Sequence, residues 1–131
     1  MNQLMKTTVA ITLGLATAIA MAAPRQLTTH NNTDVESNAY VAGTIPSQHP
    51  TRAHGETRVM WTSVKMACFG HTVNNKCWAT IKMATNTPNP IELGRVTIDI
   101  DTGEITPAQV TGNGYTITTM GPGETVLTKN P

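Results

Sequence analysis

The chain has 131 residues, of which 39% are hydrophobic, 13% charged and 4% aromatic, and its formal net charge is +1. This length predicts one domain. The low charge content argues against a solvated helical bundle or coiled coil, and the near-neutral balance provides no positive field for nucleic acid. Twenty-four residues are threonine, a β-branched residue that favours strands over helices.

The first part of the chain has the features of a secretory signal peptide. Lys6 supplies a short positive region, residues 7–20 form an apolar segment, and A-M-A at residues 20–22 is a cleavage site. The apolar segment is shorter than the roughly 20 residues that span a bilayer. We therefore predict a signal peptide at residues 1–22, a single exported domain at 23–131, and no transmembrane segment in the mature chain.

The two cysteines, Cys68 and Cys77, are predicted to form a disulfide bond. An exported chain matures in an oxidising compartment, where paired cysteines form structural bridges. Redox and metal sites usually use a C-x-x-C spacing, which these two cysteines do not have. In the chain-entropy model, closing so short a loop stabilises a small domain by roughly 2–3 kcal/mol.

Alternating apolar and polar residues, bounded by Gly, Pro and Asn, predict short β-strands along the mature chain. We find no segment of helical spacing long enough to predict a helix. Tight turns are predicted at D-T-G (101–103) and G-P-G (121–123), and loops at 44–55 and 85–90. Seven or eight strands favour an antiparallel β-sandwich with one disulfide, with a small β-barrel as the alternative. The predicted strands are residues 26–31, 38–43, 57–69, 77–84, 94–101, 103–106, 115–120 and 124–129.

A hairpin around the disulfide predicts which side chains face the core. If Cys68 lies opposite Cys77 on antiparallel strands, Val64 and Met66 share the face of the disulfide, and that apolar face points inward. The loop at residues 69–76, which contains His71, is then the hairpin tip. The other face carries two tryptophans and two lysines, namely Trp61, Lys65, Trp78 and Lys82.

This Trp/Lys face is the leading candidate for a binding surface. Tryptophan has an apolar body and a polar N–H, which suits sugar rings, interfacial lipid and protein partners. Lys65 and Lys82 could contact phosphate or carboxylate groups, and His71 lies nearby on the predicted tip. The alternative is that both tryptophans pack in the core, because tryptophan is highly buried on average.

The tripeptide Asp101-Thr102-Gly103 follows apolar residues and resembles the active-site signature of aspartic proteases. That chemistry needs two carboxylates that share a proton. A small hydrolase that uses Asp101 is therefore an alternative function, and a hairpin turn is the simpler interpretation.

Neither the acidic residues around this turn nor the histidines have the spacing of a metal site. Asp99, Asp101 and Glu104 lack the later ligands of an EF-hand loop, and no H-E-x-x-H motif is present. We predict no metal and no cofactor.

Five segments that cover much of the mature chain carry a resemblance to known proteins: residues 30–43, 53–61, 65–71, 76–83 and 112–125. They resemble small, uncharacterised proteins exported by Gram-negative intracellular pathogens, some of which are type II secretion effectors. Residues 31–33 and 53–57 show a weaker resemblance to the aegerolysin-like sandwiches, a family that binds membrane lipids. The first resemblance implies secretion through the periplasm to the exterior.

Three hypotheses for the function follow. The first is a secreted, non-catalytic binding module, a virulence effector that contacts host or envelope lipid, glycan or protein through Trp61, Trp78, Lys65, Lys82 and His71. The second is an envelope assembly protein that joins a partner by β-strand augmentation. The third is the aspartic-type hydrolase.

Overall fold

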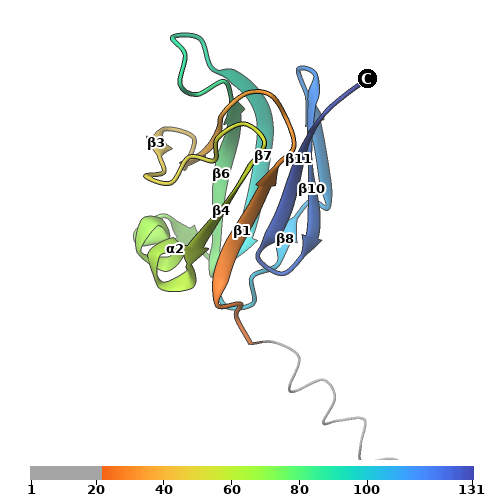
Figure 1. Cartoon of the computed structure of the whole chain (residues 1–131). Helices are drawn as coiled ribbons and strands as arrows, with labels where there is room; N and C mark the ends of the chain where they lie inside the picture. Colours follow the sequence, from red (N-terminus) through yellow and green to blue (C-terminus); the bar gives the residue numbers. More distant parts are fainter. Residues whose placement is uncertain (1–21) are drawn as a thin grey trace, which may run out of the picture.

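The computed structural model describes residues 22–131, which fold into two facing β-sheets (Figure 1). Sheet A has the strand order β4-β1-β11-β10-β9, and sheet B has the order β3-β2-β6-β7-β8, with β5 paired to β6. The elements are β1 (Gln26–Asn31), β2 (Ser37–Val41), β3 (Ile45–Pro46), β4 (Gly55–Met60), α2 (Trp61–Cys68), β5 (Thr72–Val73), β6 (Lys76–Met83), β7 (Ile91–Asp99), β8 (Ile105–Thr106), β9 (Gln109–Gly112), β10 (Tyr115–Gly121) and β11 (Glu124–Lys129).

The predicted β-sandwich with one disulfide is confirmed. Neighbouring strands are antiparallel except β1 and β11, which pair in parallel. The barrel alternative is wrong, because the strands form two separate sheets that each end in a free edge. The predicted signal peptide lies outside the described residues except for Ala22, so its cleavage stays a prediction.

The predicted turns are confirmed as well. Residues 101–103 lie in the connection from β7 to β8, with Gly103 at φ +82°. Residues 122–123 connect β10, which ends at Gly121, to β11, with Gly123 at φ +66°. Both glycines adopt a left-handed conformation that a side chain disfavours. The Cβ that any other residue would add at Gly123 would also lie 2.8 Å from Pro24.

The predicted strand at residues 57–69 is wrong beyond Met60, because the chain there forms helix α2. The buried residues of this segment are Trp61, Val64 and Cys68, a spacing of three and four that places them on one side of a helix. The disulfide Cys68–Cys77 is present, but it joins the end of α2 to β6 rather than two paired strands. The predicted hairpin register and its core face are therefore wrong.

The apolar core is divided into two clusters. The larger lies between the sheets and includes Ile81, Leu93, Ile117 and Leu127. The smaller lies beside α2 and consists of Val41, Cys68 and Cys77, with Ala42 and Ile100 packed against it.

Asn31 fixes the loop between β1 and β2. Its side chain is fully buried, and its amide donates to the carbonyl oxygens of Val35 (2.8 Å) and Thr51 (3.2 Å). Its Oδ1 accepts from the backbone N–H and the hydroxyl of Thr33 at 3.0 and 2.7 Å. One side chain therefore joins the loop after β1 to the segment before β4.

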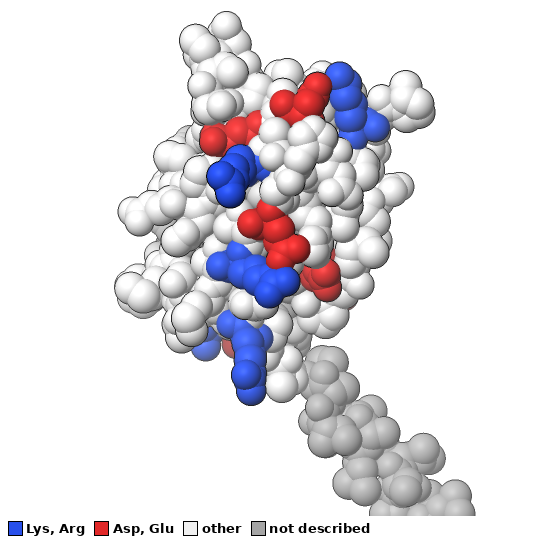
Figure 2. Space-filling model, viewed as in Figure 1, with Lys and Arg blue, Asp and Glu red and all other residues white. Residues whose placement is uncertain are grey.

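His30 connects three strands on the outer face of sheet A. Its Nδ1 lies 3.1 Å from Glu56 of β4, and its Nε2 lies 2.8 Å from Glu124 of β11. Figure 2 shows acidic and basic side chains intermingled on the visible side of the molecule. That side therefore presents no large field of one sign to a charged partner.

We expect Asn31→Ala to lower the free energy of unfolding by about 2–3 kcal/mol, because buried carbonyl and N–H groups lose their partners. Urea unfolding followed by circular dichroism measures the loss. The neighbouring exposed Asn32→Ala is the matched control and should change stability little. Equal effects of the two variants would contradict the role assigned to Asn31.

Candidate binding site

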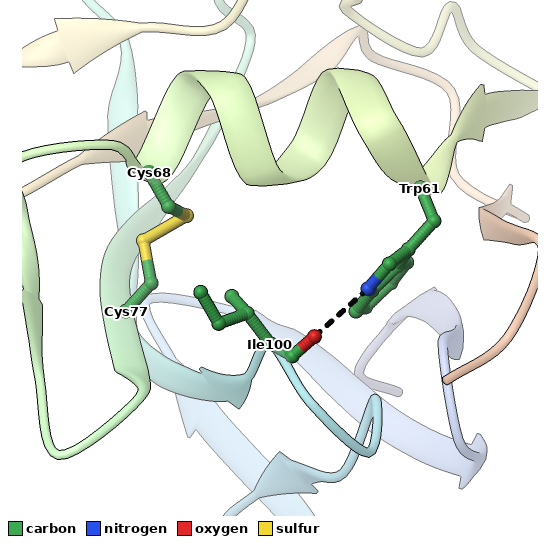
Figure 3. The surroundings of a disulfide bond; sticks show 4 residues. All are labelled: Trp61, Cys68, Cys77 and Ile100. Carbon is green, nitrogen blue, oxygen red and sulfur yellow. Dashed lines mark hydrogen bonds between the residues drawn. A yellow bond between two sulfur atoms is a disulfide. The ribbon is translucent and has the colours of Figure 1, made fainter. Parts of the chain in front are cut away.

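Trp61 lies in the interior at the start of α2, where only 5% of its surface is exposed. Its Nε1–H donates to the carbonyl oxygen of Ile100 at 3.0 Å, and its backbone N–H donates to the carbonyl of Arg25 at 2.9 Å. Figure 3 shows Trp61 at one end of the helix and the disulfide of Cys68 at the other. The prediction that Trp61 shares an exposed face with Trp78 is therefore wrong, and its contacts are those of an anchor.

Trp78 and Lys82 lie together on the outer face of sheet B, as their spacing in β6 predicts. The Lys82 ammonium lies 4.5 Å from the ring centre of Tyr40, and the Arg95 guanidinium lies 3.7 Å from that of Trp78. Sequence reasoning missed Tyr40 and Arg95, because it did not show that β2 and β7 flank β6. The guanidinium covers one face of the Trp78 ring, which leaves that face unavailable for stacking on a sugar.

Lys65 and His71 lie elsewhere, on α2 and in the loop that follows it. Both are exposed. Lys65 lines a shallow surface hollow together with Met66 and Phe69. The hairpin register places Met66 in the core, but the helical rotation turns it outward. The structure therefore separates the predicted binding residues into three places. Trp61 is buried, Trp78 and Lys82 lie on sheet B, and Lys65 and His71 lie near the disulfide.

Three exposed apolar side chains lie close in sequence to Cys68 of the disulfide, at the end of α2, directly after it and in β5. Met66, Phe69 and Val73 are 76%, 85% and 74% exposed. We call these three residues the apolar tip. They are half of the six large hydrophobic side chains that are exposed among residues 22–131, although they lie within eight positions of one another. Such a concentration on the surface of a small domain marks an interaction site.

The segment that carries the apolar tip contains no acidic residue. Residues 57–91 contain three lysines and one arginine but no aspartate or glutamate. Arg58 pairs with Glu56, and Lys76 lies 3.4 Å from Asp99 of β7. Lys82 lies on the outer face of sheet B, over Tyr40. Lys65 forms no ion pair among the described residues, and its charge is free to meet an anion beside the tip.

A cavity of about 490 Å³ lies between the two sheets and reaches α2. Its lining includes members of both core clusters, such as Val41, Ile81 and Leu127. Its exposed lining residues come from α2 and from residues 45–49, so the opening lies between these two segments. Figure 1 shows α2 and β3 on the same side of the sandwich.

The D-T-G segment at residues 101–103 forms a turn in which Asp101 is exposed and Gly103 is buried. Asp99, just before it, accepts hydrogen bonds from the backbone N–H groups of Asp101 (2.9 Å) and Thr102 (3.2 Å). The first of these bonds is the main cause that lowers the pKa of Asp99, and Lys76 adds to the effect. A carboxylate held in its ionised form is poorly suited to donate a proton.

The comparisons with known proteins decide the family. A model described as the type II secretion system substrate NttC matches residues 1–130. The chain belongs to the NttC family. The crystal structure of the Legionella pneumophila type II secretion system substrate NttC is 56% identical to it, with a TM-score of 0.81, over 82% of this chain and 100% of that one. No curated protein matches the chain.

The resemblance to small type II secreted proteins of intracellular pathogens is therefore confirmed. This NttC-family protein passes through the periplasm to the cell exterior, as the sequence predicts. The resemblance to aegerolysin-like sandwiches stays a prediction. Across residues 22–131, no helix is long and apolar enough to cross a membrane, and no three His, Cys, Asp or Glu side chains gather as metal ligands do.

We expect Trp61→Phe in this NttC-family protein to lower the free energy of unfolding by about 1–3 kcal/mol, because the Ile100 carbonyl loses its donor and the core loses volume. Urea unfolding measures this loss. Trp78→Phe, at a partly exposed position, should cost less. A Trp61→Phe variant of unchanged stability that loses membrane or partner binding would instead support a contact role.

We expect Asp99→Ala to make the protein less stable at neutral pH, with a difference that shrinks in acid. The pKa of Asp99 lies below its ordinary value of 3.8 in the folded state. Its ionised form therefore stabilises the fold above that ordinary value, and this contribution is lost as the pH falls through the lowered pKa. Urea midpoints at neutral pH and near pH 2 measure it, with Asp101→Ala as the control. A difference that does not change with pH would contradict this assignment.

Proposed function

We propose that this protein is a secreted, non-catalytic binding module that contacts membrane surfaces through the apolar tip and Lys65. The observation that carries the proposal is the exposure of Met66, Phe69 and Val73 on a structure that is covalently held. Exposed apolar side chains beside basic groups are the features of proteins that bind at the membrane interface. There, apolar side chains enter the acyl boundary and lysines meet anionic headgroups.

The rigidity of the tip supports this function. The disulfide holds the C-terminal end of α2, and Trp61 holds its N-terminal end. Phe69 directly follows the helix, and its backbone N–H bonds to the carbonyl of Met66 at 3.2 Å. A backbone that is already fixed loses little conformational entropy on binding, so more of the gain from burial appears as affinity.

The outer face of sheet B is a second candidate surface, for a partner that carries carboxylate or phosphate groups. The observation that favours it is the pair of cations, Arg95 and Lys82, stacked over Trp78 and Tyr40. Cations stacked on aromatic rings are held in place and can meet a planar anion. This face lacks the exposed apolar area of the tip, which is why we place it second.

The other two hypotheses have weaker structural support. Strand augmentation uses a free sheet edge, and sheet B ends in the two-residue strands β3 and β8. The edge strand β4 of sheet A carries exposed Glu56 and Arg58, and charged side chains discourage pairing at an edge. A hydrolase would need a proton-sharing partner for Asp101, and the neighbouring Asp99 is held ionised by the turn.

The test is sedimentation of the mature protein with vesicles of phosphatidylcholine alone or mixed with phosphatidylserine. We expect binding to the mixed vesicles, and we expect Phe69→Ser to weaken it about tenfold through the loss of buried apolar area. Met120→Ser is the matched control, because Met120 is also exposed but lies in β10, outside the tip.

Lys65→Gln tests the electrostatic part of the contact. It should weaken binding to the mixed vesicles about fivefold, and the difference should fall at high salt. Lys129→Gln, at an exposed lysine in β11, is its control. Absence of vesicle binding, or equal binding by the Phe69→Ser and Met120→Ser variants, would overturn the proposal.

A further inference from the structure

The cavity between the sheets lies between the two apolar core clusters. One side is lined by Val41, Cys68 and Cys77 of the smaller cluster, and the other by residues of the larger cluster. Facing sheets lie about 10 Å apart, and large side chains normally fill that space. Here Ala39 and Ala79 face the cavity from sheet B. Their side chains are too short to reach sheet A, so space remains.

Sheet A contributes a row of threonines to the same cavity. Thr57, Thr29 and Thr125 are cross-strand neighbours on β4, β1 and β11, and all three line the cavity. The Thr57 hydroxyl donates to that of Thr51 at 2.7 Å. Thr125 is only 4% exposed, and within residues 22–131 its hydroxyl has no hydrogen-bond partner. A buried hydroxyl without a hydrogen-bond partner is stabilised by a bound ligand that places a polar atom beside it.

The lining contains no Asp, Glu, Lys or Arg. A free carboxylate or phosphate inside the cavity would therefore lack a compensating charge and would be costly to bury. The volume falls within the range of pockets that bind small molecules, about 300–1,000 Å³. The cavity thus selects for a ligand that is mostly aliphatic, uncharged and equipped with few oxygen atoms.

We propose that the cavity binds a single acyl chain of an ester-bearing lipid, which enters between α2 and residues 45–49. The chain packs against the aliphatic wall of sheet B, and the ester oxygens accept hydrogen bonds from the hydroxyls of Thr29 and Thr125, because the Thr57 hydroxyl already donates to Thr51. At the opening, Ile45 and Met66 are exposed apolar residues, whereas Gln48 and His49 are exposed polar residues that keep a headgroup in water.

This site goes beyond the membrane contact and does not require it, because a dispersed lipid can enter the opening directly. The two surfaces nevertheless meet at Met66, which belongs both to the apolar tip and to the lining of the cavity. A tip that rests on a membrane would bring the opening close to the lipids. The test therefore uses lipid in solution, so that it does not depend on vesicle binding.

The test is calorimetric titration of the mature protein with 1-monolauroylglycerol and, separately, with laurate, each below the concentration at which it forms micelles. We expect each protein molecule to bind one monolauroylglycerol molecule, with saturation. The bound lipid should raise the melting temperature of the protein, and laurate should bind more weakly than the ester. These two probes separate an uncharged ester from a free fatty acid.

Two variants fill the cavity and one removes its buried hydroxyl. Ala79→Leu and Ala39→Leu should each weaken binding about tenfold while the unliganded melting temperature is unchanged or higher, because added methylenes occupy empty space. Thr125→Val keeps the shape and should weaken ester binding without lowering stability. Ala108→Leu, at an exposed position outside the cavity, is the matched control.

No saturable binding of either lipid, ester affinity unchanged in both cavity-filling variants, or tighter binding of laurate than of the ester would each overturn this proposal. Phe69→Ser should bind the ester normally, and Ala79→Leu should bind vesicles normally. The two sites can therefore fail separately, and each failure identifies which of the two proposals is wrong.

Discussion

The covalent bond between Cys68 and Cys77 is the constraint on which the outer half of this molecule depends. Helix α2 has eight residues, and isolated helices shorter than about 12–15 residues are marginal in water. The disulfide fixes one end of this helix to sheet B, and the Trp61 indole fixes the other end to the carbonyl of Ile100. This doubly anchored helix carries Met66 of the apolar tip and one side of the opening of the cavity.

The same region accepts two features that reduce stability. An unfilled cavity forfeits packing, and large apolar side chains remain in water at the tip. A disulfide formed during export offsets part of this loss. Secretion therefore has a structural consequence here. The oxidising compartments on the route allow the disulfide to form, and its stabilisation lets a small domain tolerate an internal cavity and exposed apolar side chains.

Local sequence patterns predicted correct strand boundaries where apolar and polar residues alternate and no helical spacing fits the same segment. The ranges predicted for β1 and β11 agree with the structure, and the glycines at 103 and 123 mark real turns. Helix α2 was missed because its buried residues span only two turns. Over so short a segment, alternation from Val59 through Trp61 to Ser63 fits a strand equally well, and tertiary packing decides between them.

The sequence by itself determined the disulfide and the two-sheet fold, because cysteine count and local periodicity carry these properties. The route of secretion was implied by the resemblance of its segments to type II secreted proteins. Only the tertiary structure decided that Trp61 is buried while Met66 is exposed, and that Trp78 is stacked under Arg95. These outcomes depend on which distant segments pack together. Strand neighbours far apart in the chain, and the space left between two sheets, have no local signature in a single sequence.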